Sequence, residues 1–380
     1  MSDSTRILVR GNDALAMGAI KAGCKHYFGY PITPQNEVPE FMSRELPKIG
    51  GEFVQAESEL AAINMVLGAS AVGIRSMTSS SSPGISLMQE GLSYMAGQEL
   101  PGVVINVVRC GPGLGGIAPS QSDYFQAVKG GGHGDYHLIV LAPFSVQEMY
   151  DHSMLAFELS DKYRNPAMVL ADAVLGQMQE PIVEREQAPE PPYKMWALDG
   201  ADGRPARHLK SLLLKEGELE AHNKLLQEKY REIAKHEVRF DEYRIEDAEL
   251  VVAAFGTAAR IARTAVSQAR KEGIKVGLFR PVTVYPYPKK RLAEISKRVK
   301  NFLVVEMNTG QMLEDVKLSV AGDAQVSFHG RPGGGIPTPN EVLKRIKKYY
   351  PSQAESNAQG PPSAGSPRQA LGRQRRQGPT

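Results

Sequence analysis

Cysteine is scarce in this chain: Cys24 and Cys110 are the only two among its 380 residues. Two thiols so far apart in the sequence do not make a disulfide framework, and an iron–sulfur cluster takes about four cysteine ligands. The chain therefore cannot hold such a cluster by itself. His133 and His137 have no nearby set of acidic partners, so no metal site is expected either.

Long apolar runs and an excess of charge are also missing. No stretch reaches the roughly 18 apolar residues of a membrane span, and the first residues, MSDSTRILVRGNDA, lack the apolar core of a signal peptide. We therefore expect no membrane attachment and a cytoplasmic location. The net charge is +3, and the residues from Ser352 onward carry four arginines and one glutamate. The rest of the chain is neutral, which gives no indication of a nucleic-acid partner.

What the sequence does contain is a regular alternation of strand-like and helical patterns. The alternation runs to residue 178 and resumes near Glu249, which predicts an α/β fold with mostly parallel sheets. We expect a first domain over 1–179, a second over 249–351 and a disordered tail over 352–380. Between the domains, 180–248 is rich in proline and charge and reads as an extended linker with an amphipathic helix over 209–233.

Two polar residues follow probable strands of the first domain. Val103 to Val108, VVINVV, is interpreted as a fully apolar strand, and Arg109 comes directly after it. Thr33 lies between two prolines in PITP, which stiffen the turn after another strand. Ligands of open α/β sheets bind at the carboxyl ends of the strands. Arg109 is therefore well placed for a substrate carboxylate, although a structural salt bridge would explain it too.

A helix is predicted to begin at Ser58, a plausible N-cap, with Glu57 and Glu59 beside it. Leu60, Ile63, Met65, Val66 and Leu67 would form its buried face, and Gly68 would allow close packing. Acidic residues at a helix N-terminus are common because they complement the helix dipole, so either glutamate has a structural explanation. Further on, TSSSSPG at 78–84 is expected as a turn that binds an anion or a cofactor edge, or merely caps the next helix.

Several long motifs in one collinear order resemble the α subunits of 2-oxoacid:ferredoxin oxidoreductases, in particular those acting on 2-oxoisovalerate and 2-oxoglutarate. The resemblance covers about residues 5–348. The motifs are YPITP (30–34), ESELAAINMVLGAS (57–70), SSSSPGISLMQEGLSYMAGQELP (79–101), VVRCGPGLG (107–115), FRPVTVYPYP (279–288) and VVEMNTGQM (304–312).

This resemblance implies a thiamine diphosphate enzyme in which the first domain is the pyrimidine-binding domain and the second resembles the transketolase C-terminal domain. The family's catalytic glutamate stands nine residues before a helix glycine, which selects Glu59 over Glu57. It contacts the aminopyrimidine ring and promotes proton transfer there. Thr33 and Arg109 match the residues that hold the 2-oxoacid carboxylate. The implied reaction is oxidative decarboxylation with coenzyme A to an acyl-CoA, CO2 and reduced ferredoxin.

The resemblance also implies partner subunits. This chain has no GDG motif followed by an asparagine pair for Mg-diphosphate, and no cluster cysteines. Magnesium and iron–sulfur clusters are therefore expected on a β subunit, with γ and ferredoxin-like δ subunits in many members. Two alternatives stay open: a non-redox thiamine diphosphate decarboxylase or synthase subunit, and a non-catalytic α/β scaffold subunit.

Overall fold

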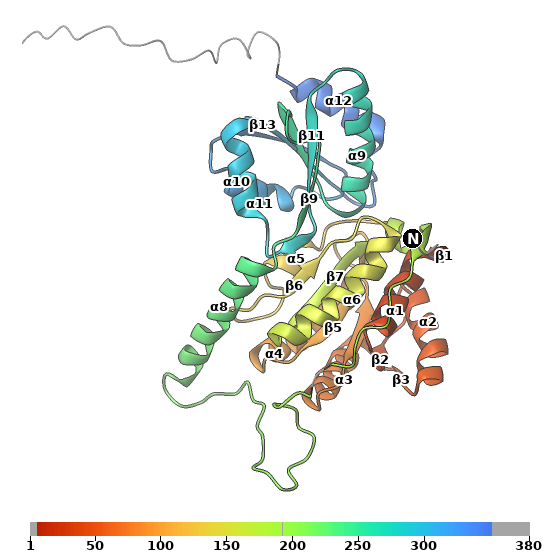
Figure 1. Cartoon of the computed structure of the whole chain (residues 1–380), viewed down its shortest axis with the longest axis vertical. Helices are drawn as coiled ribbons and strands as arrows, with labels where there is room; N and C mark the ends of the chain where they lie inside the picture. The colour runs from red at the N-terminus through yellow and green to blue at the C-terminus, as the bar shows by residue number, and fades with distance from the viewer. Residues whose placement is uncertain (1–5, 192, 352–380) are drawn as a thin grey trace, which may run out of the picture. The chain divides into compact units, whose positions relative to one another are not determined.

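A computed structural model describes residues 6–191 and 193–351 (Figure 1). The predicted disordered tail, 352–380, lies outside the described residues, as do residues 1–5 and 192. Alternating strands and helices build two mainly parallel sheets, as expected for an α/β fold.

The first half of the chain supplies six parallel strands of a seven-stranded sheet. The seventh strand, β12, comes from the second half and is antiparallel to its neighbour. In sheet order the strands are β12 (Thr283–Tyr285), β6 (Ile139–Leu141), β7 (Pro166–Asp172), β5 (Gly102–Val108), β4 (Ser76–Ser80), β2 (His26–Gly29) and β3 (Glu52–Gln55). Because the other six strands are parallel, their carboxyl ends all reach the same edge.

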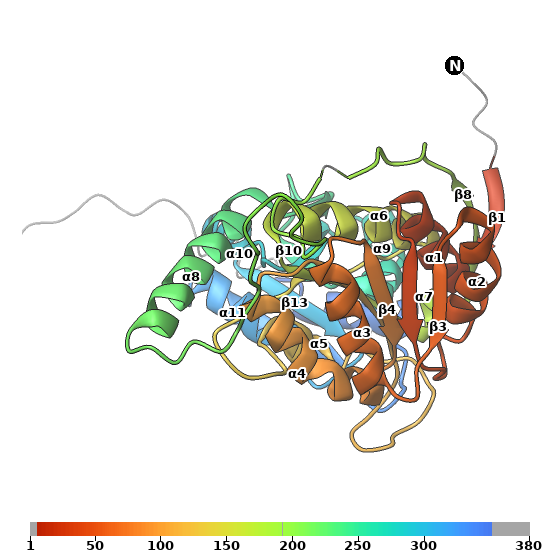
Figure 2. The same ribbon diagram turned by 90° about the horizontal axis from the view of Figure 1, so that it is seen from below.

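Helices cover both faces of this sheet, as right-handed crossovers require (Figure 2). One face carries α1 (Gly11–Lys21), α2 (Glu37–Glu45) and α6 (Val146–Tyr163), and the other carries α3 (Glu59–Ala71), α4 (Pro83–Gly97) and α5 (Tyr124–Val128). Short helices η1 (Leu46–Ile49) and α7 (Ala173–Gln177) complete this half. A two-stranded antiparallel ribbon joins β1 (Arg6–Arg10) to β8 (Gln179–Val183).

The second half forms a five-stranded sheet that is parallel except for its edge strand β9. In sheet order the strands are β14 (Gln325–Gly330), β13 (Asn301–Glu306), β10 (Leu250–Ala253), β11 (Val276–Pro281) and β9 (Phe240–Tyr243). Its helices are α9 (Gly256–Lys271), which packs against α12 (Pro339–Tyr349), and α10 (Lys289–Arg298), which packs against α11 (Met312–Val320). Helix α8 (Glu218–His236) precedes this sheet.

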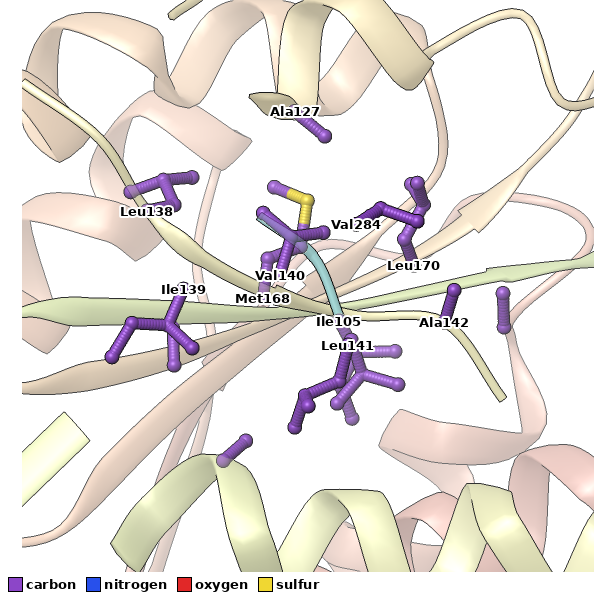
Figure 3. Close-up of a cluster of buried hydrophobic side chains, with 14 of the residues drawn as sticks. Ile105, Ala127, Leu138, Ile139, Val140, Leu141, Ala142, Met168, Leu170 and Val284 are labelled. Atoms are coloured by element: carbon purple, nitrogen blue, oxygen red, sulfur yellow. The ribbon is translucent and has the colours of Figure 1, made fainter. Parts of the chain in front are cut away.

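The larger of two hydrophobic cores contains apolar side chains from both halves, and the smaller lies within the second half. Figure 3 shows Val284 of β12 among residues of β5, β6 and β7, including Ile105, Val140 and Met168. All of these side chains are almost fully buried. Strand β12 therefore lies in the second half of the sequence but packs with the first sheet.

Polar side chains also join the halves. The Gln121 side chain donates to the carbonyl oxygen of Phe255 at 2.8 Å and accepts from the Met307 N–H at 3.0 Å. The Asp172 carboxylate accepts from the Thr257 hydroxyl at 2.9 Å. Burial raises the pKa of Asp172 to about 6. Because these groups are buried, leaving any of them unpaired would cost about 1–3 kcal/mol. The hydrogen bonds therefore help to hold the two halves together.

Several expectations about secondary structure were wrong in detail. The expected linker contains strand β8, and its helix starts at Glu218 rather than 209, because Gly217 has a φ of 77° that no α-helix continues through. Strands β9, β12 and β14 were not expected. Strand β12 is three residues long and its pairing depends on β6, a partner remote in the sequence. The serine-rich stretch is not all turn either, since Thr78 to Ser80 belong to the buried strand β4.

Candidate functional site

The carboxyl edge of the seven-stranded sheet brings the three predicted site residues to neighbouring strand ends. Thr33 follows β2, Glu59 follows β3 and begins α3, and Arg109 follows β5. Strand β4 lies between β2 and β5, and its last residues reach the same edge. The arrangement matches the expectation that ligand-binding residues gather at this edge.

Glu59 is buried at the first position of α3. The hydroxyl of Ser58 accepts a hydrogen bond from the Ala61 N–H at 3.3 Å, which confirms the predicted N-cap. Glu59 is 5% exposed, whereas Glu57 is exposed. The Ser80 hydroxyl donates to Oε1 of Glu59 at 3.3 Å. A carboxylate here is favoured by the helix dipole, yet its burial is unusual for an acid that serves the dipole alone.

Glycine at position 84 makes room for this carboxylate. A Cβ atom on Gly84 would collide with the Glu59 carboxylate and the Ser80 hydroxyl. The start of α4 therefore lies directly against Glu59. Close packing was predicted at Gly68 instead, and that prediction was wrong: Gly68 is exposed and nothing described lies within 4 Å of the place its Cβ would take. Leu60, assigned to the buried face, is 46% exposed, because that side of α3 points away from the sheet.

Arg109 is 8% exposed and donates only to main-chain carbonyl oxygens. Its Nη1 donates to Thr33 at 3.1 Å and its Nη2 to Leu114 at 3.3 Å. Its Nε is buried and has no hydrogen-bond partner within the described residues. Thr33 and Arg109 are therefore adjacent, but they meet through the Thr33 carbonyl. The Thr33 residue is exposed and its peptide bond to Pro34 is cis.

The backbone of Arg109 is held by Ser82. The Ser82 hydroxyl accepts from the Arg109 N–H at 3.1 Å and donates to the Arg109 carbonyl oxygen at 3.0 Å. Ser82 has a φ of 27°, a conformation that costs a residue other than glycine on the order of 1–3 kcal/mol. The residue is thus kept in an unfavourable backbone conformation next to the predicted substrate arginine.

Sequence reasoning missed several polar residues at this edge. Asn106 lies in the strand that was taken as fully apolar, and it is completely buried. Its Nδ2 donates to Asp123 at 2.9 Å, and burial raises the pKa of Asp123. Gln35 is also completely buried, and it accepts a hydrogen bond from the Ser79 hydroxyl. The one signal in the sequence that could have indicated these buried polar contacts was Asn106, a single asparagine in an apolar run.

A cavity of about 630 Å³ is lined by Cys110, which follows Arg109, by Ser82 and by loops of the other sheet. Glu59, Thr33 and Arg109 are not among the residues that line it. The start of α4 and the loop after β5 form one wall, and residues Asn308 to Gln311 after β13 form part of the other. Its lining is mainly neutral hydroxyl, amide and main-chain groups, with Asp123 as the carboxyl group. A space of this size accommodates a small-molecule ligand.

Comparisons with known proteins identify the family of this chain. Residues 17–238 match the family model described as pyruvate flavodoxin/ferredoxin oxidoreductase, thiamine diphosphate-binding, and residues 248–342 match pyruvate:ferredoxin oxidoreductase core domain II. The ketoisovalerate oxidoreductase subunit VorB of Methanothermobacter marburgensis is 52% identical over 342 residues, which cover 90% of this chain and 97% of that protein. The 2-oxoglutarate synthase subunit KorA of Methanothermobacter thermautotrophicus is 39% identical over 368 residues, covering 90% and 98%.

Solved structures show the same fold. A 2-oxoglutarate:ferredoxin oxidoreductase from Magnetococcus marinus, solved with 2-oxoglutarate, coenzyme A and succinyl-CoA bound, superposes with a TM-score of 0.81 and 27% identity over 92% of this chain and 66% of that chain. A split-gene transketolase, at a TM-score of 0.56 and 12% identity, shares the fold alone. With a family model matching more than half of its residues and a relative 52% identical, this chain belongs to the thiamine diphosphate-binding pyruvate flavodoxin/ferredoxin oxidoreductase family.

Proposed function

We propose that this chain is the α-type subunit of a 2-oxoacid:ferredoxin oxidoreductase, in which Arg109 binds the carboxylate of the 2-oxoacid and Glu59 contacts the cofactor. The observation that carries the proposal is the state of Arg109. Its guanidinium group is buried, pairs with no carboxylate in the described residues and keeps Nε without a partner. A buried cation without a counter-ion is costly, and an anionic substrate would supply one.

The carboxylate of a 2-oxoacid fits this requirement. A guanidinium group binds a carboxylate with two parallel hydrogen bonds, and such charge-assisted bonds are about twice as strong as neutral ones. The exposed Thr33 residue is next to Arg109, so its hydroxyl would add a neutral hydrogen bond to the same carboxylate. The two residues then fix the position of the keto carbon at the sheet edge.

Glu59 fits the aminopyrimidine side of thiamine diphosphate. Its carboxylate is buried, Oε1 accepts from Ser80, and Oε2 makes no hydrogen bond to the described residues. Gly84 leaves the space that the carboxylate occupies. When bound, thiamine diphosphate supplies the carbon nucleophile that adds to the keto group and accepts the electron pair left by decarboxylation. Glu59 would hold and return the proton at the pyrimidine ring nitrogen, which is general acid–base catalysis.

The remaining parts of the reaction fall to partner subunits. Cys24 and Cys110 cannot ligate a cluster, so electron transfer to ferredoxin needs clusters held elsewhere. We propose a β subunit that binds the Mg-diphosphate and a cluster, with γ and ferredoxin-like δ subunits completing the assembly. We also propose a division into 1–179, a connecting segment 180–248, and 249–351. The break between the two family models, at residues 238 and 248, lies near the second of these boundaries.

For the substrate we propose 2-oxoisovalerate first and 2-oxoglutarate second. The ketoisovalerate oxidoreductase relative is 52% identical and the 2-oxoglutarate synthase relative 39%. The acyl group would pass to coenzyme A, which is present in the Magnetococcus marinus structure.

The test is reconstitution of the assembled enzyme with its partner subunits. Reduction of methyl viologen should require a 2-oxoacid, coenzyme A and thiamine diphosphate together, and kcat/KM should be higher for 2-oxoisovalerate than for 2-oxoglutarate. Release of CO2 without viologen reduction would support the non-redox decarboxylase instead. If neither CO2 release nor reduction occurs in an intact assembly that binds thiamine diphosphate, the chain is a scaffold subunit.

A further inference from the structure

We propose that Ser82, Asn106 and Asp123 form a positioning network that sets where the Arg109 guanidinium meets the substrate carboxylate. The inference rests on the proposed function of Arg109 and extends it to three residues that do not touch the guanidinium group. They come from three different elements: Ser82 caps the start of α4, Asn106 lies within β5, and Asp123 precedes α5.

The contacts run in one chain from Asp123 to Arg109. The Asp123 carboxylate accepts from Asn106 Nδ2 at 2.9 Å, and Asn106 Oδ1 accepts from the Ser82 N–H at 3.3 Å. The Ser82 hydroxyl then bridges the N–H and the carbonyl oxygen of Arg109 at 3.1 and 3.0 Å. One hydroxyl thus satisfies both backbone groups of the residue at the point where β5 ends.

Asn106 shows that the network is built into the core. It is completely buried in a strand whose other six residues are glycine, valine and isoleucine, and both ends of its amide group are hydrogen-bonded. An apolar residue there would serve the sheet equally well but would leave the Ser82 N–H and the Asp123 carboxylate without this partner. The hydrogen bonds of Asn106 therefore hold the segments at Ser82 and Asp123 in place.

Ser82 shows which way the network acts. Its φ of 27° is unfavourable for any residue with a Cβ, so the backbone conformation alone would favour glycine at this position. Serine is explained by its hydroxyl, which glycine lacks and which holds the Arg109 backbone. Ser82→Gly should therefore relieve the backbone while releasing Arg109, which separates positioning from stability.

The role is positioning, because the contacts reach the main chain of Arg109. The guanidinium group is oriented separately by the carbonyl oxygens of Thr33 and Leu114. A shift of the Arg109 backbone would move the guanidinium group away from those acceptors and from the carboxylate. The expected consequence is weaker substrate binding at an almost unchanged chemical step.

The test uses the assembled enzyme with four variants, Ser82→Gly, Ser43→Ala, Arg109→Ala and the double variant Ser82→Gly/Arg109→Ala. Ser82→Gly should raise the KM for the 2-oxoacid by roughly three- to tenfold, with kcat within about twofold and the thermal midpoint unchanged or higher. Ser43→Ala is the control, since its hydroxyl is exposed, bonds only to the Glu40 carbonyl oxygen of its own helix and lies away from the cavity. It should leave KM and kcat unchanged.

The double variant decides between positioning and general structure. If Ser82 acts through Arg109, the double variant should be no worse than Arg109→Ala alone. Effects that multiply, or a Ser82→Gly variant with normal KM while Arg109→Ala is impaired, would overturn the network. If Arg109→Ala itself leaves KM unchanged, the assignment of the substrate carboxylate to Arg109 is wrong, which is a separate failure.

A second pair of variants, at Asp123, tests the network if Ser82→Gly does not fold. Asp123→Ala removes the acceptor for Asn106 Nδ2 and should raise KM roughly threefold, whereas Asp123→Asn keeps one acceptor oxygen and should raise KM by less. Equal KM values for the two Asp123 variants would also overturn the proposal.

Discussion

Arg109 and Arg280 stand at the carboxyl ends of two buried strands, β5 and β11, and they differ in what they bind. Arg280 donates to both oxygens of Glu148 at 2.9 and 2.8 Å and lies over the Phe144 ring at 4.0 Å. Arg109 donates only to carbonyl oxygens and pairs with no carboxylate in the described part of the chain. The first arginine has its anion within the protein, and the second lacks one.

The carboxylates at the two edges show the same difference. Glu306, at the end of β13, accepts from the N–H groups of Met312 and Leu313 and from Asn308 Nδ2. Glu59 accepts only from Ser80 among the described residues. Both sheets are mainly parallel, but Glu306 and Arg280 have their partners within the protein, whereas Glu59 and Arg109 are the groups that we propose bind a ligand.

The largest effect is expected from breaking the ion pair between Arg280 and Glu148. Arg280→Ala should lower the free energy of unfolding by about 3 kcal/mol, because it leaves Glu148 without its counter-ion. Arg263→Ala removes an exposed arginine of the same half and should cost about 0.5 kcal/mol or less. Urea unfolding followed by circular dichroism measures both. Similar losses in the two variants would contradict the structural role of Arg280.

The next effect is on turnover. Glu59→Gln should lower kcat of the assembled enzyme by on the order of a hundredfold or more, the usual contribution of general acid–base catalysis. Glu57→Gln, at the exposed neighbour, should stay close to wild type. Steady-state assays at saturating substrate and thiamine diphosphate compare the two. A larger loss for Glu57→Gln would mean that the wrong glutamate has been assigned.

Glu306 at the second edge should contribute to a pH dependence of stability, together with Asp172 at the first edge, whose pKa burial raises to about 6. Burial raises the pKa of Glu306 from 4.5 to about 7. The folded state therefore binds more protons than the unfolded state between these values, so the free energy of unfolding should fall as the pH rises from about 4.5 to about 7. Glu306→Gln removes this titration and should flatten the decline. Unfolding at pH 5 and pH 7.5 measures it, and an equally steep decline in the variant would assign it to other groups.

The smallest effect is expected at Thr33. Thr33→Ala removes one neutral hydrogen bond to the substrate, so the KM for the 2-oxoacid should rise by roughly two- to fivefold. Ser43→Ala, at an exposed serine that bonds only within its own helix, is a suitable control. A change in the affinity for thiamine diphosphate with normal KM would place Thr33 at the cofactor.

Local patterns were enough to predict the main elements but not their pairing. The Ser58 cap and the apolar run before Arg109 predicted α3 and β5, because both signals are contained in a few neighbouring residues. Strand β12 could not be predicted, since its three residues become a strand only beside β6. Motif matching selected Glu59, Thr33 and Arg109, whereas Asn106 and Asp123 went unrecognised because their importance depends on contacts with Ser82 and with each other.

The most direct test of whether Arg109 binds the substrate carboxylate is the KM of Arg109→Ala for the 2-oxoacid, measured in the assembled enzyme. A hydrogen bond to a charged group is worth about 1.5–3 kcal/mol, so KM for the 2-oxoacid should rise roughly tenfold or more at saturating coenzyme A. The affinity for thiamine diphosphate and the thermal midpoint should stay close to wild type, because Arg109 has no internal counter-ion to lose. An unchanged KM, with a loss of stability or of cofactor affinity instead, would contradict the account.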